Sequence, residues 1–135
     1  MNHVAFNPVP LTLLFTGLCA LMQCALTVMV VVRRLQARVS FLDGGDKLLL
    51  RRIRAHGNFT ETVPMALLLM ALLEISGLSS IGLIIFGIAL LLGRVLHASS
   101  LLTNNARWSR ASGMTLTIAV ISIEGVCALW LFFAR

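Results

Sequence analysis

The sequence has too few charged side chains to cover the surface of a water-soluble protein. Only 12% of its 135 residues are charged, and 59% are hydrophobic. Soluble domains carry about 25% charged residues. The mean hydropathy is +0.96. This composition excludes an ordinary soluble domain and predicts a chain whose apolar side chains face membrane lipid.

Cysteine, tyrosine and acidic residues are also scarce. The chain has three cysteines and no tyrosine, so it offers no phenol hydroxyl. Cys19, Cys24 and Cys127 lack metal-ligand spacing, and we interpret them as small apolar filling within helices, with no metal site. Eleven basic residues outnumber five acidic ones. The basic residues lie between long apolar runs, which is typical of a membrane protein and argues against a nucleic-acid partner.

The apolar runs predict four membrane-spanning helices. A helix needs about 20 residues to cross the hydrocarbon core. The predicted spans are residues 10–32, 62–78, 79–93 and 111–134. The middle two are short, so we expect each to include residues from its flanks or to continue as helix beyond the membrane. We also expect them to form a tight hairpin. We therefore predict an all-α membrane protein, a four-transmembrane-helix bundle in a single domain, 1–135.

The basic residues predict the orientation of the bundle. Ten of the eleven lie between the first and second spans or between the third and fourth. The positive-inside rule places that end in the cytoplasm and both termini outside. We expect the basic side chains Arg33, Arg34 and Arg52 to contact anionic lipid headgroups.

A few polar residues have simple structural interpretations. Asp46 is expected to cap a helix that begins at Lys47. Glu74 is expected to reach the headgroups at the outer end of the second span. Glu124 lies near the bilayer centre at the depth of Gln23, so we expect a hydrogen bond between these two side chains, with Glu124 protonated.

One polar stripe enters the membrane with the second span. At 100° per residue, Arg51, Arg54, Asn58 and Glu61 fall within an arc of about 80°. Arginine binds carboxylates through two parallel hydrogen bonds, and a carboxylate can receive an ammonium group. The stripe therefore suits a small zwitterionic ligand with several carboxylates and one amine. A lipid-facing basic cluster is the alternative, although it leaves Asn58 and Glu61 unexplained.

Two segments of the chain resemble the MAPEG family, the membrane-associated proteins in eicosanoid and glutathione metabolism. The first is RIRAHGNFTETVP, in which Arg54, Asn58, Glu61 and Pro64 match the family signature. The second is GRVLHASSLL followed by NNARWSRASGMT, which carries Arg94, His97 and Arg110 at corresponding positions. The resemblance covers essentially the whole chain and is strongest to the short bacterial members.

The resemblance implies a homotrimer in the bacterial inner membrane. This trimer would bind glutathione near the cytoplasmic face. Its further partners would be membrane lipid and a lipophilic small-molecule substrate. The implied glutathione-binding residues are Arg38, Arg54, His56, Asn58, Glu61, Arg94 and His97, to which helix geometry adds Arg51. Arg110 matches the arginine that stabilises the glutathione thiolate, and Arg107 is the fallback. Leu101 stands where the eicosanoid-making members carry a tyrosine, so leukotriene or prostaglandin synthesis is not expected.

The sequence leaves three functions open. The first is a glutathione-dependent transferase or peroxidase that acts on lipophilic electrophiles. The second is a small four-helix multidrug transporter with a membrane-embedded acid, although such transporters usually place that acid in the first span. The third is a family member that binds glutathione without catalysis.

Overall fold

Four long helices make up the regular structure of the described residues. The structure, a computed structural model, describes residues 9–103 and 107–134, and of Arg107 only the backbone. The helices are α1 (Pro10–Ala37), α2 (Lys47–Ile75), α3 (Ser80–Thr103) and α4 (Arg107–Phe133). Each is long and apolar enough to cross a membrane, and the described residues include no strand. The predicted all-α, four-span fold is confirmed.

The helices extend beyond the predicted spans at one end of the molecule. In particular, α2 begins at Lys47 rather than at residue 62, and α3 continues to Thr103 rather than ending at residue 93. The expectation that the short middle spans continue as helix is therefore confirmed. The polar stripe of the second span consequently lies on regular helix, so its residues keep the spacing on which the prediction was based.

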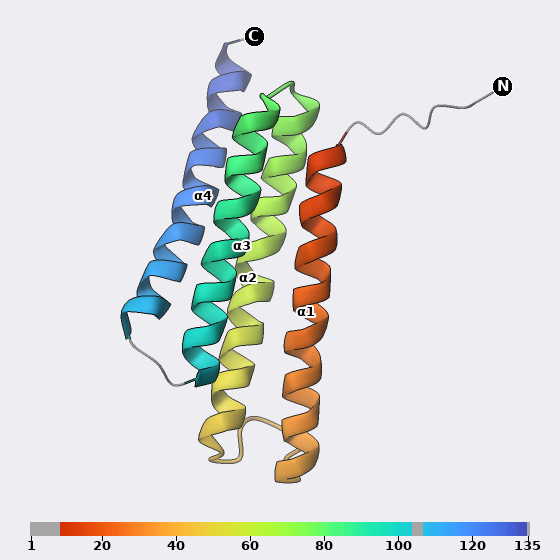
Figure 1. The fold of residues 1–135 in the computed structure, drawn as a ribbon, viewed down its shortest axis with the longest axis vertical. Helices are drawn as coiled ribbons and strands as arrows, with labels where there is room; N and C mark the ends of the chain where they lie inside the picture. Colours follow the sequence, from red (N-terminus) through yellow and green to blue (C-terminus); the bar gives the residue numbers. More distant parts are fainter. Residues whose placement is uncertain (1–8, 104–106, 135) are drawn as a thin grey trace, which may run out of the picture.

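The helices run alternately up and down, with α2 and α3 in the middle of the bundle (Figure 1). Helix α1 packs against α2 and α3, and α4 packs against the same pair. Among the described residues, α1 and α4 make no contact with each other. Segment 38–46 and the start of α4 lie at the lower end in Figure 1. The bundle is therefore open between its outer helices.

Backbone geometry explains the tight connection between α2 and α3. Gly77 adopts a left-handed conformation with φ +87°. The Leu78 amide donates to the Leu73 carbonyl at 3.0 Å, and the Gly77 amide donates to the Glu74 carbonyl at 3.1 Å. This pair of bonds is the Schellman motif that ends helices at a glycine. The predicted hairpin is confirmed.

Asp46 caps α2 as predicted and is also paired with α1. Its carboxylate accepts from the Leu49 amide at 2.7 Å and forms an ion pair with Arg33 at 2.6 Å. The hydrogen bond from Arg33, followed by that from Leu49, lowers the pKa of the Asp46 carboxyl below its ordinary value of 3.8. The cap therefore fixes both the first residue of α2 and its position beside α1.

The other two arginines expected at lipid headgroups also bind protein atoms. Arg34 donates to the Ser40 and Leu42 carbonyls at 3.2 and 2.9 Å, and Arg52 donates to the Met29 carbonyl at 2.7 Å. These arginines, like Arg33, therefore hold the loop end of the bundle together.

The middle of the bundle is closed by a tight crossing of α3 and α4. A Cβ atom added to Gly113 would lie 2.6 Å from the Gly93 carbonyl oxygen and 2.6 Å from the His97 amide nitrogen. Only two glycines allow backbones this close. The crossing fixes the lower halves of α3 and α4, and therefore the side chains that both helices present to one another there.

Two interpretations of polar residues were wrong. Glu74 does not reach past the bundle, because its carboxylate accepts from the Leu11 and Thr12 amides at 2.9 and 2.8 Å. Gln23 does not bond Glu124, because it is 2.9 Å from His56 Nε2 and its helix does not touch α4. Residues at equal depth were expected to pair, but the arrangement of the helices keeps them apart.

Candidate functional site

A cleft of about 570 Å³ opens at the loop end of the bundle. Its size is within the range of small-molecule sites, about 300–1,000 Å³. Helices α2, α3 and α4 and segment 38–46 all contribute to its walls. The lining residues are Leu42, Asp43, Leu50, Ile53, Arg54, Gly57, Asn58, Glu61, His97, Leu101 and Arg110.

The polar stripe predicted on α2 forms one wall of this cleft. Arg54, Asn58 and Glu61 all line it, as their helical spacing predicts. Arg54 and Glu61 are exposed, and neither side chain makes a hydrogen bond or ion pair with the described part of the chain. Their charges are therefore available to a ligand.

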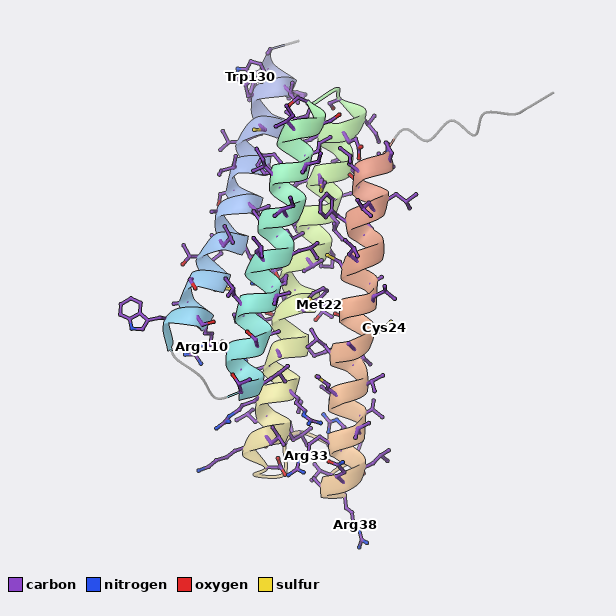
Figure 2. The ribbon with its side chains drawn as sticks, viewed as in Figure 1. Met22, Cys24, Arg33, Arg38, Arg110 and Trp130 are labelled. Carbon is purple, nitrogen blue, oxygen red and sulfur yellow. The ribbon has the colours of Figure 1, made fainter. Side chains whose placement is uncertain are left out.

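The other polar side chains of the cleft come from α3, from α4 and from segment 38–46, which contributes Asp43. His97 is 7% exposed and reaches the cleft from α3. Arg110 lines it from the first turns of α4, beside the lower part of α3 in Figure 2. Arg110 is exposed and, within residues 9–103 and 107–134, has no hydrogen-bond or ion-pair partner. Two guanidinium groups and one carboxylate without partners thus share one cleft.

Arg94 lies behind the cleft, with 1% of its surface exposed. Its guanidinium donates to the Asn58 side-chain oxygen at 2.5 Å, to Thr62 Oγ1 at 3.2 Å and to the Gly113 carbonyl at 3.3 Å. Asn58 in turn directs its amide nitrogen toward Met114 Sδ at 3.6 Å. Arg94 therefore links α2, α3 and α4 and fixes the orientation of Asn58.

Three more of the predicted site residues do not line this cleft. Arg38 ends α1 in a left-handed conformation with φ 55° and points away from the bundle (Figure 2). Arg51 lies on α2 at the edge of the polar stripe and is half-buried. His56 faces α1, where it meets Gln23. The described chain thus brings together five predicted residues, namely Arg54, Asn58, Glu61, His97 and Arg110.

Sequence reasoning did not find the apolar wall of the cleft. Leu42, Leu50, Ile53 and Leu101 line it beside the polar stripe, but of these only Leu101 stood out in the sequence. In a chain this rich in leucine and isoleucine, a ligand-facing apolar residue has the same pattern as a lipid-facing one. The spacing of Leu50 and Ile53, within one turn of Arg54, is the signal that was present.

A cleft lined by charged side chains that have no partner among the described residues, at one end of four helices long and apolar enough to cross a membrane, indicates a membrane protein with a candidate ligand site. The MAPEG family profile matches residues 12–130, and the chain belongs to this family. It is 37% identical, over 117 residues, to inner membrane protein YecN of Escherichia coli strain K12. The match covers 87% of this chain and 88% of that protein. The YecN protein of Escherichia coli O6:H1 strain CFT073 matches equally well.

These comparisons agree with the fold and confirm the resemblance seen in the sequence. Four membrane-spanning helices, together with relatives named as inner membrane proteins, indicate a multi-pass inner membrane protein. The matched range includes every residue that lines the cleft.

Proposed function

We propose that the chain binds glutathione in this cleft and uses it as co-substrate for a transferase or peroxidase reaction on lipophilic electrophiles. The observation that carries the proposal is the convergence of Arg54, Glu61 and Arg110, three charged side chains without partners in the described chain. Glutathione has two carboxylates, one ammonium group and a thiol. In this proposal Arg54 binds a carboxylate, Glu61 binds the ammonium group and Arg110 faces the sulfur.

Membership of the MAPEG family supports the choice of ligand, because that family includes glutathione-dependent enzymes. The proposal also includes two features beyond the single chain, a homotrimer and a cleft that faces the cytoplasm. Chemical cross-linking of the purified protein should give a trimer as the largest product. Reporter fusions should be active outside the cytoplasm at the carboxyl terminus and inside it within residues 40–48; the reverse pattern would refute the orientation.

Calorimetry with purified protein in detergent tests the binding site. Arg54 and Glu61 are exposed, and an exposed ion pair contributes about 0.2–1 kcal/mol, or roughly up to fivefold in affinity. Arg54→Ala and Glu61→Gln should therefore each weaken glutathione binding by up to about fivefold. Lys47→Ala is the matched control, because Lys47 is an exposed cation outside the cleft. If both cleft variants bind like the control, the stripe is a lipid-facing cluster.

Ultraviolet difference titration of bound glutathione tests the role of Arg110. A free thiol with a pKa of about 8.5 is only about 3% thiolate at pH 7. Lowering that pKa by about two units makes most of it nucleophilic and requires about 2.7 kcal/mol of preferential thiolate stabilisation. Arg110→Ala should retain glutathione but lose the thiolate signal, whereas Arg110→Lys should keep part of it. An unchanged thiolate signal in Arg110→Ala would make Arg110 a simple anchor of α4.

One observation favours a second candidate, a proton-coupled transporter. Glu124 is 1% exposed, and its Oε2 atom has no partner in the described part of the chain. A buried acid within a membrane helix is a common element of proton-coupled transport. Uptake into vesicles that depends on a proton gradient and is lost in Glu124→Gln would support the transporter. Substrate-dependent consumption of glutathione would support the enzyme, and binding without consumption would leave a non-catalytic glutathione binder.

A further inference from the structure

Met114 lies one helical turn beyond Arg110 on α4, close to the polar wall of the cleft. The two residues are about 6 Å apart along the helix axis, and their spacing places both side chains on one face of α4. The Asn58 amide nitrogen donates to Met114 Sδ at 3.6 Å, and the Arg94 guanidinium donates to the same sulfur at 4.0 Å. Asn58 lines the cleft and Met114 does not. Met114 is therefore behind the cleft wall, in contact with Asn58 and with the arginine that holds it.

The sulfur of Met114 has an unusual environment for a methionine. Methionine fills apolar gaps in most proteins, and its thioether is only a weak acceptor. Within residues 9–103 and 107–134, a polar hydrogen reaches the sulfur of Met114 and of no other methionine. The other methionines in these ranges are Met22, Met29, Met65 and Met70. Leucine would fill the volume of Met114 about equally well, so packing alone does not account for two donors at its sulfur.

A thioether in these surroundings can react with a hydroperoxide. A lone pair of the sulfur attacks the terminal peroxide oxygen, so an S–O bond forms while the O–O bond breaks. The sulfur gives up two electrons and becomes a sulfoxide. The leaving oxygen takes the hydroperoxide proton and departs as an alcohol, or as water when the oxidant is hydrogen peroxide. The sulfoxide oxygen is a strong acceptor, which the donors of Asn58 and Arg94 would stabilise, whereas a methionine exposed to hydrocarbon finds no donor there.

We propose that Met114 is a site of oxidation by hydroperoxides, and that its sulfoxide weakens ligand binding by displacing the side chain of Asn58. Sulfur accepts hydrogen bonds through its lone pairs, and oxidation adds oxygen to one of these lone pairs. The 3.6 Å between Asn58 Nδ2 and Met114 Sδ cannot hold both an S–O bond and an N–H···O hydrogen bond of about 2.7–3.2 Å. Asn58 must therefore move away from the sulfur, and its hydrogen bond from Arg94 is lost. The effect on binding rests on the proposed glutathione site, but the oxidation itself does not.

Mass spectrometry tests the oxidation site without any ligand. The protein in phospholipid nanodiscs is treated with hydrogen peroxide, and the sulfoxide at each methionine is followed over time. Met114 should oxidise faster than Met65, although Met65 is the more exposed of the two. Asn58→Asp keeps the oxygen that Arg94 binds but removes the amide hydrogen. It should slow the oxidation of Met114 by roughly two- to tenfold, the contribution of one hydrogen bond. Equal rates in the parent and in Asn58→Asp would overturn the role of the donors.

Calorimetry with glutathione, after the peroxide has been removed, tests the effect on binding. The oxidised parent should bind glutathione roughly two- to tenfold more weakly than the untreated protein. Met114→Leu has no sulfur to oxidise at this position but keeps all three cysteines, so its affinity should be the same before and after peroxide. Met114→Gln carries a side-chain oxygen there and should reproduce the weaker binding without oxidant. Met65→Leu is the matched control, and its affinity should fall on oxidation as that of the parent does.

The outcomes separate the oxidation site from the proposed function. Oxidation of Met65 ahead of Met114 would overturn the site itself. Complete oxidation of Met114 with an unchanged affinity for glutathione would overturn the displacement of Asn58. If the untreated parent does not bind glutathione, the proposed function fails and the effect on binding fails with it. The mass spectra would still decide whether Met114 is the oxidation site.

Discussion

The crossing of α3 and α4 at Gly93 and Gly113 can be tested with a single methyl group. A Cβ at Gly113 would lie 2.6 Å from both the Gly93 oxygen and the His97 nitrogen, whereas ordinary contacts begin at 3.4 Å. Both contacts are with backbone atoms, so the two helices must move apart by nearly 1 Å. Overpacking of this kind costs about 1–3 kcal/mol. The bond from Arg94 to the Gly113 carbonyl is already 3.3 Å long, so it would break as the helices separate.

Gly125→Ala on the same helix is the matched control, because a Cβ there meets nothing within 4 Å. Replacing glycine by alanine within a helix favours folding by about 0.8–1.0 kcal/mol. Gly113→Ala gains the same helix-propensity stabilisation. The difference in unfolding free energy between the two variants therefore measures the clash alone. We expect Gly113→Ala to be less stable than Gly125→Ala by about 1–3 kcal/mol in reversible unfolding in mixed micelles, and to bind glutathione more weakly. If the two variants unfold within about 0.5 kcal/mol of each other, the close approach of the helices is wrong.

Three further predictions concern buried or paired polar groups. Arg33 lowers the pKa of Asp46 in the folded protein. The ionised carboxylate should therefore stabilise the folded protein fully well above pH 3.8, and this contribution should be lost as the pH falls through the lower folded pKa. Asp46→Asn, which still caps the helix, should remove this acid dependence of unfolding. Glu74→Gln should lower the free energy of unfolding by about 0.5–2 kcal/mol and accelerate amide hydrogen exchange at the amino end of α1. Unchanged exchange there would contradict this prediction. Arg94→Lys keeps the charge but cannot reproduce the three hydrogen bonds of the guanidinium. We expect its free energy of unfolding to fall by about 1.5–3 kcal/mol, and its glutathione binding to weaken because Asn58 is no longer held in place. A variant equal to the parent in both measurements would show that Arg94 does not position Asn58.

The parts of the structure that could be predicted depend on short stretches of sequence. The four spans follow from long apolar runs, and the cap of α2 follows from Asp46 immediately before a helical segment. The alignment of Arg54, Asn58 and Glu61 follows from the period of a helix. None of these features requires knowledge of which helices are neighbours.

The parts that could not be predicted depend on the packing of one helix against another. Arg94 was predicted as a ligand-binding residue; it does not line the cleft, and it bonds Asn58 on α2 and the Gly113 carbonyl on α4. Gln23 was expected to meet Glu124, but the described residues of α1 and α4 make no contact. The backbone of Leu42 is left-handed, with φ +52°, and has no local sequence signal, since glycine, and not leucine, is the residue expected at such a position.

Glu74 has a consequence for how the protein is assembled during its synthesis. The amides of Leu11 and Thr12 lie at the start of α1, where no carbonyl within the helix can accept their hydrogen bonds. In hydrocarbon, an amide without a hydrogen-bond acceptor costs free energy. Their acceptor is synthesised about sixty residues later, at the far end of α2. Glu74 reaches them only if α2 returns across the membrane to the side on which α1 began. This one carboxylate therefore favours correct insertion of the first two helices and penalises a second helix that fails to cross.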